Sequence, residues 1–281
     1  MLRVLGLAVF LSGCAARQAT RDPLAKKLRS LDDRYTRAAT AAELAPVVQD
    51  TVLQMERHPD ESRLMWRLAR VLAAQAAAGE AEAAPTSYAA AREVALRCLS
   101  LRPGFSAQVA AAGGRLVPAA VTHLGPEDLP CATWALHAWG RALDLRGAGA
   151  VDPDLPGLEA LAAWAAATGG PPAERVWVAA AAGLVLSFRP PLDGAPPVPG
   201  RPLLEEAVRI GPGHLTPLVD LALYGLDPAA DAGLRRRLLE DAVAPAADPP
   251  GAAAFNMRAR ARAAAALPTA AGGPSEPSET P

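Results

Sequence analysis

The stretch YAAAREVALRCLSLRP, from Tyr88 to Pro103, has small residues at positions 91, 95 and 98 and ends in a proline. Positions three and four residues apart lie on one face of an α-helix, so these small side chains share a face. Such a face lets a partner helix approach closely. The stretch therefore predicts a helix that packs tightly against a neighbour and ends near Pro103.

A second copy of the pattern, LLEEAVRIGP, covers Leu203–Pro212. Each copy follows a helical segment that carries a tryptophan, Trp66 before the first copy and Trp177 before the second. A small-residue helix closed by a proline is typical of the second half of a tetratricopeptide-like (TPR-like) repeat. The linkers Gly79–Ser87 and Arg189–Gly200 are longer than the turn of a standard repeat. We therefore expect an all-α fold, an irregular TPR-like solenoid of helical hairpins.

Helical patterning runs along most of the chain and is interrupted by clusters of Pro and Gly. Alanine dominates the apolar residues and aromatic residues are few, which favours closely packed helices over a β-sheet. We expect helices 42–57 and 60–78 to form an antiparallel pair, because each has apolar residues at three- and four-residue spacing. The full set of expected helices is 22–40, 42–57, 60–78, 85–102, 127–146, 154–168, 172–187, 201–211, 215–225, 230–244 and 250–267.

The first fourteen residues have the order of a bacterial lipoprotein signal, with Arg3, an apolar run over Val4–Leu11, and then Ser-Gly-Cys14. The run is about eight residues long and about 20 are needed to span a bilayer, so we expect a removable signal and no transmembrane helix here. A lipidated Cys14 would hold the protein on the periplasmic side of a membrane, and Ala15 favours the outer membrane. The alternative is an ordinary secretory signal with a chance cysteine, which would leave the protein free in the periplasm.

The chain divides by composition into four parts. We expect residues 1–13 to be the signal peptide, 14–21 a short polar tether, 22–268 the TPR-like helical domain and 269–281 a disordered tail. The tail has too little apolar surface to fold. The 28 basic and 29 acidic side chains nearly balance and form no basic stripe. This charge pattern argues against nucleic acid or an anionic lipid surface as the main partner.

Besides Cys14, the chain has Cys98 and Cys131, without the Cys-x-x-Cys spacing that would indicate a metal site. One interpretation is a disulfide between them, formed in an oxidising periplasm. Both cysteines occupy small apolar positions of expected helices, so we favour buried free thiols.

No strong catalytic motif is present. The chain lacks His-Glu-x-x-His, Gly-x-Ser-x-Gly and Gly-x-x-x-x-Gly-Lys. Its four histidines are scattered, which argues against a metal site. We therefore expect a protein that is not an enzyme and needs no metal or other cofactor. An enzyme would require a catalytic cluster assembled from residues distant in sequence.

The most unusual segment is CATWALHAWGRALD, from Cys131 to Asp144. On a helix, Trp134 shares a face with Ala138 and lies near Arg141, while Gly140 removes a side chain where a neighbour must approach closely. In a structural interpretation, the tryptophans fill a groove between helix layers and Gly140 admits another helix. In a functional interpretation, Trp134 and Arg141 line an apolar cavity with one polar anchor. The further candidates for the lining of a ligand or partner site are Gly140, Trp66 and Trp177.

These features resemble the T-component family of tripartite ATP-independent periplasmic (TRAP) transporters, the TatT-type lipoproteins. Members have a lipidation signal and a body of irregular TPR-like helix pairs. Their central motif, an aromatic-Trp helix followed by Asn-Leu-Gly-Arg-Trp, is matched here by Trp134, Gly140 and Arg141. Ala138 stands where the family usually has asparagine, and Ala142 where it has an aromatic residue.

Two further segments are similar to elements of the same family. Tyr88–Pro103 is similar to its Ala-Leu-x-Cys-Leu-x-Leu-x-Pro element, and Asn256–Leu267 to its closing Asn-x-x-Ala-x-x-Arg-Ala helix. The resemblance implies a non-catalytic accessory component of a solute uptake system. Such a component docks a periplasmic solute-binding protein, self-associates into a homo-oligomer, and takes a hydrophobic or organic-acid ligand in a cleft or pore.

A second hypothesis is a structural scaffold, similar to the TPR lipoproteins that support outer-membrane protein assembly or pilus secretion. Such scaffolds bind extended peptides along a concave face and need no enclosed cavity. The identity of captured native partners separates the two hypotheses, because the helical framework alone fits many functions.

Overall fold

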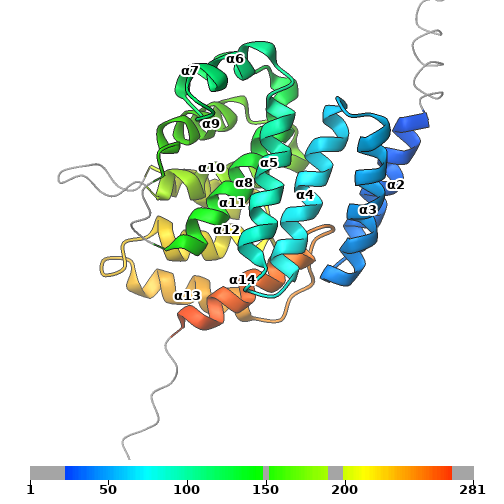
Figure 1. Cartoon of the computed structure of the whole chain (residues 1–281). Coiled ribbons are helices and arrows are strands. Elements are labelled where there is room, and N and C mark those ends of the chain that lie inside the picture. The colour runs from blue at the N-terminus through cyan, green and yellow to red at the C-terminus, as the bar shows by residue number, and fades with distance from the viewer. Residues whose placement is uncertain (1–22, 148–151, 189–198, 268–281) are drawn as a thin grey trace, which may run out of the picture.

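A computed structural model describes residues 23–147, 152–188 and 199–267, and within these ranges the chain folds into α-helices without any β-strand (Figure 1). The expected all-α class is confirmed. The predicted signal, tether and tail, including Cys14, lie outside the described residues, as does most of the linker Arg189–Gly200. None of the described helices is both long and apolar enough to cross a bilayer.

The helix boundaries follow the clusters of Pro and Gly. The α-helices are α2 (Pro23–Arg37), α3 (Ala41–Arg57), α4 (Ser62–Ala78), α5 (Ala84–Leu99), α6 (Pro103–Ala111), α7 (Pro118–Val121), α8 (Leu129–Arg146), α9 (Leu155–Thr168), α10 (Pro172–Ser187), α11 (Arg201–Ile210), α12 (Leu215–Asp220), α13 (Ala232–Val243) and α14 (Ala253–Ala266). A short 3₁₀ helix, η1 (Pro126–Asp128), precedes α8, and a π-helical turn, η2 (Leu221–Gly225), follows α12.

Two short helices, α6 and α7, were absent from the sequence prediction. The prediction treated Pro103 as the end of a unit, and α5 does end at Leu99. The same proline is also the first residue of α6, and Pro118 is the first residue of α7. Proline suits this position because its missing N–H would have no helical partner there.

The expected pairing of α3 with α4 is confirmed. Thr40 begins α3 through a capping box, in which its hydroxyl accepts a hydrogen bond from the Glu43 amide at 3.3 Å and the Glu43 carboxylate accepts one from the Thr40 amide at 3.0 Å. Such a cap satisfies backbone donors that the helix leaves free. Leu44 and Val47 of α3 are buried in the same core as Leu64 of α4.

The small-residue face of α5 packs against both α4 and α8. Ala91, Ala95 and Cys98 on this face are buried. Cys98 is bonded to Cys131 of α8 in a disulfide, so the preference for free thiols was wrong. The close approach that small side chains allow places the two Cα atoms 5.8 Å apart, within the range that a disulfide bridges.

Helix α8 lies in the interior and packs against α4, α5, α9 and α10. It is buried along nearly its whole length, including the polar residues His137 and Arg141. A Cβ atom on Gly140 would lie 3.0 Å from Leu184 of α10, so this glycine allows the close approach of α10 that its sequence context predicts.

The last helix, α14, returns to the first part of the chain. It packs against α4 as well as α12 and α13, and it crosses below the end of α4 in Figure 1. Arg258 of α14 donates hydrogen bonds to the carbonyl oxygens of Ala76, Ala77 and Gly79, at 3.2, 3.2 and 2.9 Å. It therefore satisfies carbonyl groups that α4 leaves free at its C-terminus.

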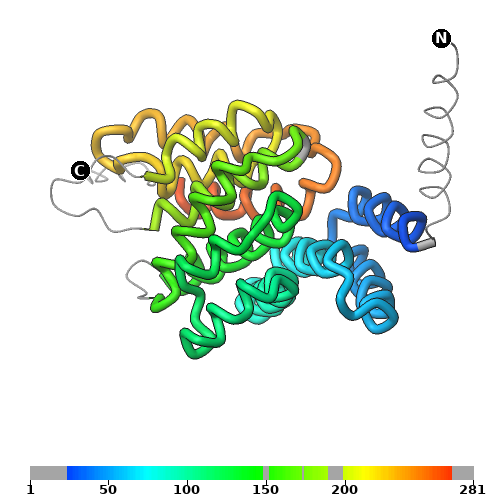
Figure 2. Tube along the Cα trace, turned by 90° about the horizontal axis from the view of Figure 1, so that it is seen from above, coloured from blue at the N-terminus to red at the C-terminus, as the bar shows by residue number. Residues whose placement is uncertain are grey.

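Seen from above, α2 and α3 lie on one side of the molecule and α11 to α13 on the other (Figure 2). Neighbouring helices pack in sequence order, as α3 with α4, α9 with α10, α10 with α11, and α13 with α14. The contact between α14 and α4, however, joins helices far apart in the chain. The described helices thus form hairpins around a central helix, α8.

We predict that Gly157→Ala lowers the free energy of unfolding by about 2–3 kcal/mol, because a Cβ atom there would lie 2.2 Å from the carbonyl oxygen of Leu116. The matched control is Gly233→Ala on α13, where the nearest atom to a new Cβ is 3.9 Å away. That variant should be as stable as the parent, or up to ~1 kcal/mol more stable. Urea unfolding measures both, and equal midpoints for the two variants would contradict the close contact of α9 with the segment before α7.

Candidate functional site

A cavity of about 280 Å³ lies between α2, α4, α8, α10 and the segment before α14. We call it the aromatic cavity. Thr36 and Pro250 at its edge are exposed, so the cavity reaches solvent beside them. Its volume is just below the roughly 300–1,000 Å³ typical of small-molecule sites. Its aromatic and charged lining residues are Tyr35, Trp66, Trp134, Trp177, Arg70 and Glu174.

Three residues singled out from the sequence meet in this cavity, namely Trp66 of α4, Trp134 of α8 and Trp177 of α10. The ring centroids of Trp134 and Trp177 are 5.7 Å apart, and Trp177 lies 4.8 Å from Phe255 of α14. Aromatic pairs at these distances contribute about 0.5–1.5 kcal/mol beyond the burial of their area. The wall of the cavity is therefore held in place by packing from four helices.

Tyr35 joins the two ends of the described chain at the cavity. Its hydroxyl donates a buried hydrogen bond to the carbonyl oxygen of Gly251 at 3.0 Å. Burial raises the pKa of Tyr35 to about 12, so the hydroxyl stays protonated at neutral pH and continues to donate. The guanidinium of Arg70 lies 4.0 Å from the centre of the Tyr35 ring, a cation–π contact.

Arg70 shares one carboxylate with Arg67. Asp32 of α2 pairs with Arg67 at 2.7 Å and with Arg70 at 2.5 Å. Desolvation by burial opposes ionisation of Asp32, but the two guanidinium groups outweigh it and hold the pKa of this carboxyl below its ordinary value. Arg70 thus shapes the cavity wall, and the three groups together keep one net positive charge. The buried Nε atom of Arg70 has no hydrogen-bond partner among the described residues.

Glu174 differs from Arg70 because none of the described residues donates a hydrogen bond to its carboxylate. It lies in the first turn of α10, three residues before Trp177, and is partly buried. Desolvation by burial raises the pKa of Glu174 above its ordinary value. The cavity therefore offers apolar aromatic walls and one hydrogen-bond acceptor.

Arg141 lies away from the aromatic cavity. It lines a separate space of about 10 Å³ beside Tyr88, Phe255 and Arg258, which is room for about one water molecule. The functional interpretation that placed Trp134 and Arg141 in one cavity does not describe the geometry. Trp134 and Arg141 are seven residues apart on α8, and the aromatic cavity is bounded there by Pro130, Thr133 and Trp134.

Arg141 belongs to a buried cluster of four charges with Asp220, Asp144 and Arg262, which we call the ion cluster. Arg141 donates two hydrogen bonds to Asp220, one of them at 2.9 Å, and lies 3.3 Å from Asp144. Arg262 lies 2.8 Å from Asp220 and 3.1 Å from Asp144. The hydroxyl of Tyr224 also donates to Asp144. The cluster is neutral overall and joins α8, α12, α14 and η2.

The pKa values in the ion cluster reflect this pairing. Desolvation by burial opposes ionisation of Asp220, but the charges of Arg141 and Arg262 outweigh it and hold the pKa of Asp220 below its ordinary value. Desolvation likewise opposes the charged form of Arg141, and Asp220 more than compensates, so its pKa is raised. Asp220, Arg141 and Arg262 are consequently charged at neutral pH, and the cluster has a structural role.

His137 lies between the aromatic cavity and the ion cluster. Its ring is 5.0 Å from Phe255 and 5.5 Å from Trp134, and its Nε2 atom is buried with no hydrogen-bond partner among the described residues. Desolvation and the charge of Arg141 lower the pKa of His137 to about 3. The imidazole is therefore neutral at neutral pH and packs as one more aromatic ring.

The sequence contained signals for some of the residues that the sequence analysis missed in the aromatic cavity and in the ion cluster. Arg70 follows Trp66 by four residues on α4, and Glu174 precedes Trp177 by three on α10, so each shares a helix face with a tryptophan that was singled out. Asp220 is a charged residue in the apolar run after Leu215, which indicates burial with a partner. Tyr35 gave no such signal, because only the tertiary fold brings it to Gly251.

The described residues contain no group of three or more His, Cys, Asp or Glu side chains placed to hold a metal ion. The walls of the aromatic cavity are formed largely by aromatic side chains. No protein-family model matches the chain, and a comparison with curated protein sequences finds no relative.

We predict that Asp220→Asn lowers the free energy of unfolding by about 3–5 kcal/mol, because it leaves Arg141 and Arg262 buried with only Asp144 to balance them. The control is Asp241→Asn, an exposed carboxylate on α13, which should leave stability essentially unchanged. The double variant Asp220→Asn/Arg262→Gln restores neutrality and should recover part of the loss in a double-mutant cycle. Additive effects of the two substitutions would contradict the coupling of these charges.

We predict an acid-dependent loss of stability from His137. Its folded pKa lies below the ordinary value of 6.5, so the unfolded chain binds the proton more readily and stability falls as the pH drops below 6.5. The loss from this residue alone amounts to about 2 kcal/mol between pH 6.5 and 4.5.

Urea unfolding of the parent and of His137→Leu between pH 4.5 and 8 tests this prediction. The variant should have a shallower slope below pH 6.5 and the same slope above pH 7. His214, whose pKa burial also lowers, accounts for part of the slope that remains. Identical slopes in the two proteins below pH 6.5 would show that His137 is protonated in the folded state.

Proposed function

We propose that the protein is a non-catalytic, lipid-anchored helical adaptor on the periplasmic side of a bacterial membrane, more specifically the outer membrane. In this proposal it is an accessory component of a TRAP-type solute uptake system. It docks a periplasmic solute-binding protein, self-associates, and binds an apolar ligand in the aromatic cavity. Its helix hairpins are an irregular TPR-like solenoid closed by the contact of α14 with α4.

The observation that carries the proposal is the aromatic cavity. Four aromatic rings surround about 280 Å³ that reaches solvent, and the one cationic lining residue, Arg70, is paired with Asp32. Burial of a ligand's apolar surface stabilises binding by about 25 cal/mol for each Å² removed from water. The free acceptor at Glu174 favours a ligand with an N–H or O–H group. These properties favour an apolar or aromatic molecule over an organic acid at this cavity.

The disulfide between Cys98 and Cys131 supports the exported location. Disulfides persist in oxidising compartments such as the bacterial periplasm and are rare where thiols are kept reduced. The lipoprotein signal at Cys14 supports the membrane anchor, and the resemblance to the T-component family supports the partner. The N-terminal mass of the mature protein tests the anchor, because a lipidated Cys14 carries the added mass of its acyl groups.

A fluorescence titration of the intact chain with N-phenyl-1-naphthylamine, a neutral aromatic probe with one N–H, tests the cavity. We predict that Trp177→Ala weakens binding at least tenfold, which corresponds to about 1.4 kcal/mol of lost wall contact. The matched control is Trp164→Ala, a partly buried tryptophan on α9 outside the cavity, which should bind like the parent. Equal affinity of the parent and Trp177→Ala would refute the cavity as the ligand site.

Capture of partners from native membranes by the full-length protein tests the adaptor role. Recovery of a solute-binding protein supports the proposal. Recovery of a subunit for outer-membrane protein assembly or pilus secretion in its place would support the scaffold hypothesis and refute the uptake role.

A further inference from the structure

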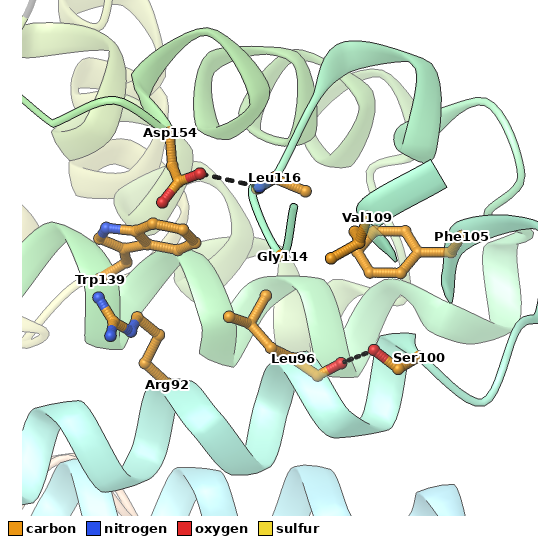
Figure 3. A pocket seen from close by; sticks show the side chains of 9 residues that line it. All are labelled: Arg92, Leu96, Ser100, Phe105, Val109, Gly114, Leu116, Trp139 and Asp154. Carbon is orange, nitrogen blue, oxygen red and sulfur yellow. Dashed lines mark hydrogen bonds between the residues drawn. The ribbon is translucent and has the colours of Figure 1, made fainter. Parts of the chain in front are cut away.

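A second cavity, of about 150 Å³, lies between α5, α6, α8 and the segments just before α7 and α9 (Figure 3). It shares no lining residue with the aromatic cavity. We call it the Arg92 cavity, because Arg92 of α5 is its one cationic lining residue. An inference about it stands independently of the proposed function.

Arg92 has a different environment from Arg70 and Arg141. Among the described residues, no carboxylate lies within ion-pair distance of its guanidinium, whereas Arg70 and Arg141 each have one. The buried Nε of Arg92, like that of Arg70, has no hydrogen-bond partner among these residues. The guanidinium lies 4.9 Å from the centre of the Trp139 ring. Trp139 is fixed in turn, since its indole N–H donates to Asp152 at 3.0 Å. The cavity thus contains a partly buried positive charge, held against an aromatic face, with its polar hydrogens available.

The one acidic lining residue, Asp154, is occupied elsewhere. Its Oδ1 atom accepts a hydrogen bond from the backbone N–H of Leu116 at 2.8 Å. Figure 3 shows Asp154 and Arg92 on opposite sides of the Trp139 ring. Asp154 therefore positions the segment before α7 and forms no ion pair with Arg92.

Apolar side chains form the remainder of the cavity. Leu96 of α5, Phe105 and Val109 of α6 lie on one side of it, next to Leu116 (Figure 3). Phe105 is fully buried, so this wall is part of the core. A cavity of about 150 Å³ lined by apolar side chains is large enough to hold benzene. The space therefore fits an apolar group of about six carbon atoms.

We propose that the Arg92 cavity binds a small organic carboxylate. The carboxylate accepts hydrogen bonds from the Arg92 guanidinium beside Trp139, and the apolar group lies against Leu96, Phe105 and Val109. A guanidinium binds a planar carboxylate in the two-pronged geometry that suits both groups. The aromatic cavity, with the acceptor at Glu174, selects a different class of ligand.

Calorimetric titration of the full-length protein with benzoate tests the proposal. Benzoate has the required charge and size, and benzamide is its neutral counterpart. We expect the parent to bind benzoate at least tenfold more tightly than benzamide, and Arg92→Met to bind benzoate at least tenfold more weakly than the parent. The matched control is Arg97→Met, which removes one exposed positive charge from the same helix and should bind benzoate like the parent.

A second variant keeps the test decisive if Arg92→Met fails to fold. Val109→Phe retains Arg92 but fills the apolar part of the cavity, and it should also lose benzoate binding. Both variants should bind N-phenyl-1-naphthylamine like the parent, which separates this site from the aromatic cavity. The proposal is overturned if the parent does not bind benzoate, if benzamide binds equally well, or if either variant retains the affinity of the parent.

Discussion

Burial of α8 on all sides is the constraint on which the rest of the structure depends. A helix can have neighbours on every face only if its side chains let them approach, and α8 meets this condition with alanines and with Gly140 against α10. The disulfide at Cys131 fixes the same helix to α5. Because four helices pack around α8, its sequence determines where α4, α5, α9 and α10 lie relative to one another.

Burial of α8 also determines the state of its polar residues. A charged side chain in the interior is tolerated only with partners of opposite charge, and Arg141 obtains them from Asp144 on its own helix and from Asp220, 79 residues along the chain. His137 lies on the same buried helix, and burial keeps its imidazole neutral at neutral pH. Apolar residues of similar volume often stabilise a buried site as well as an ion pair does. The ion cluster joins α12 and α14 to α8.

Local patterns in the sequence were sufficient for the helical class, for most helix boundaries and for singling out the three tryptophans of the aromatic cavity. They were insufficient at Pro103, which follows one helix and is also the first residue of the next. They were also insufficient where a contact joins distant segments, as the hydrogen bond from Tyr35 to Gly251 does. The disulfide illustrates the same limit. Small apolar positions indicate close packing of two helices, but only their register shows that Cys98 and Cys131 face each other. Arg141 was predicted as the polar anchor of an apolar cavity, and its partner Asp220 lies too far along the chain to be inferred.

The two cavities follow from the helical geometry of α8. Trp134 and Trp139 are five residues apart, which at about 100° per residue turns them about 140° from each other around the helix axis. Trp134 therefore lines the aromatic cavity and Trp139 the Arg92 cavity, on nearly opposite sides of one buried helix. The charges beside them differ, because Arg70 is paired with Asp32 whereas Arg92 has only the Trp139 face. A buried helix cannot shift toward one cavity without moving its packed neighbours at the other.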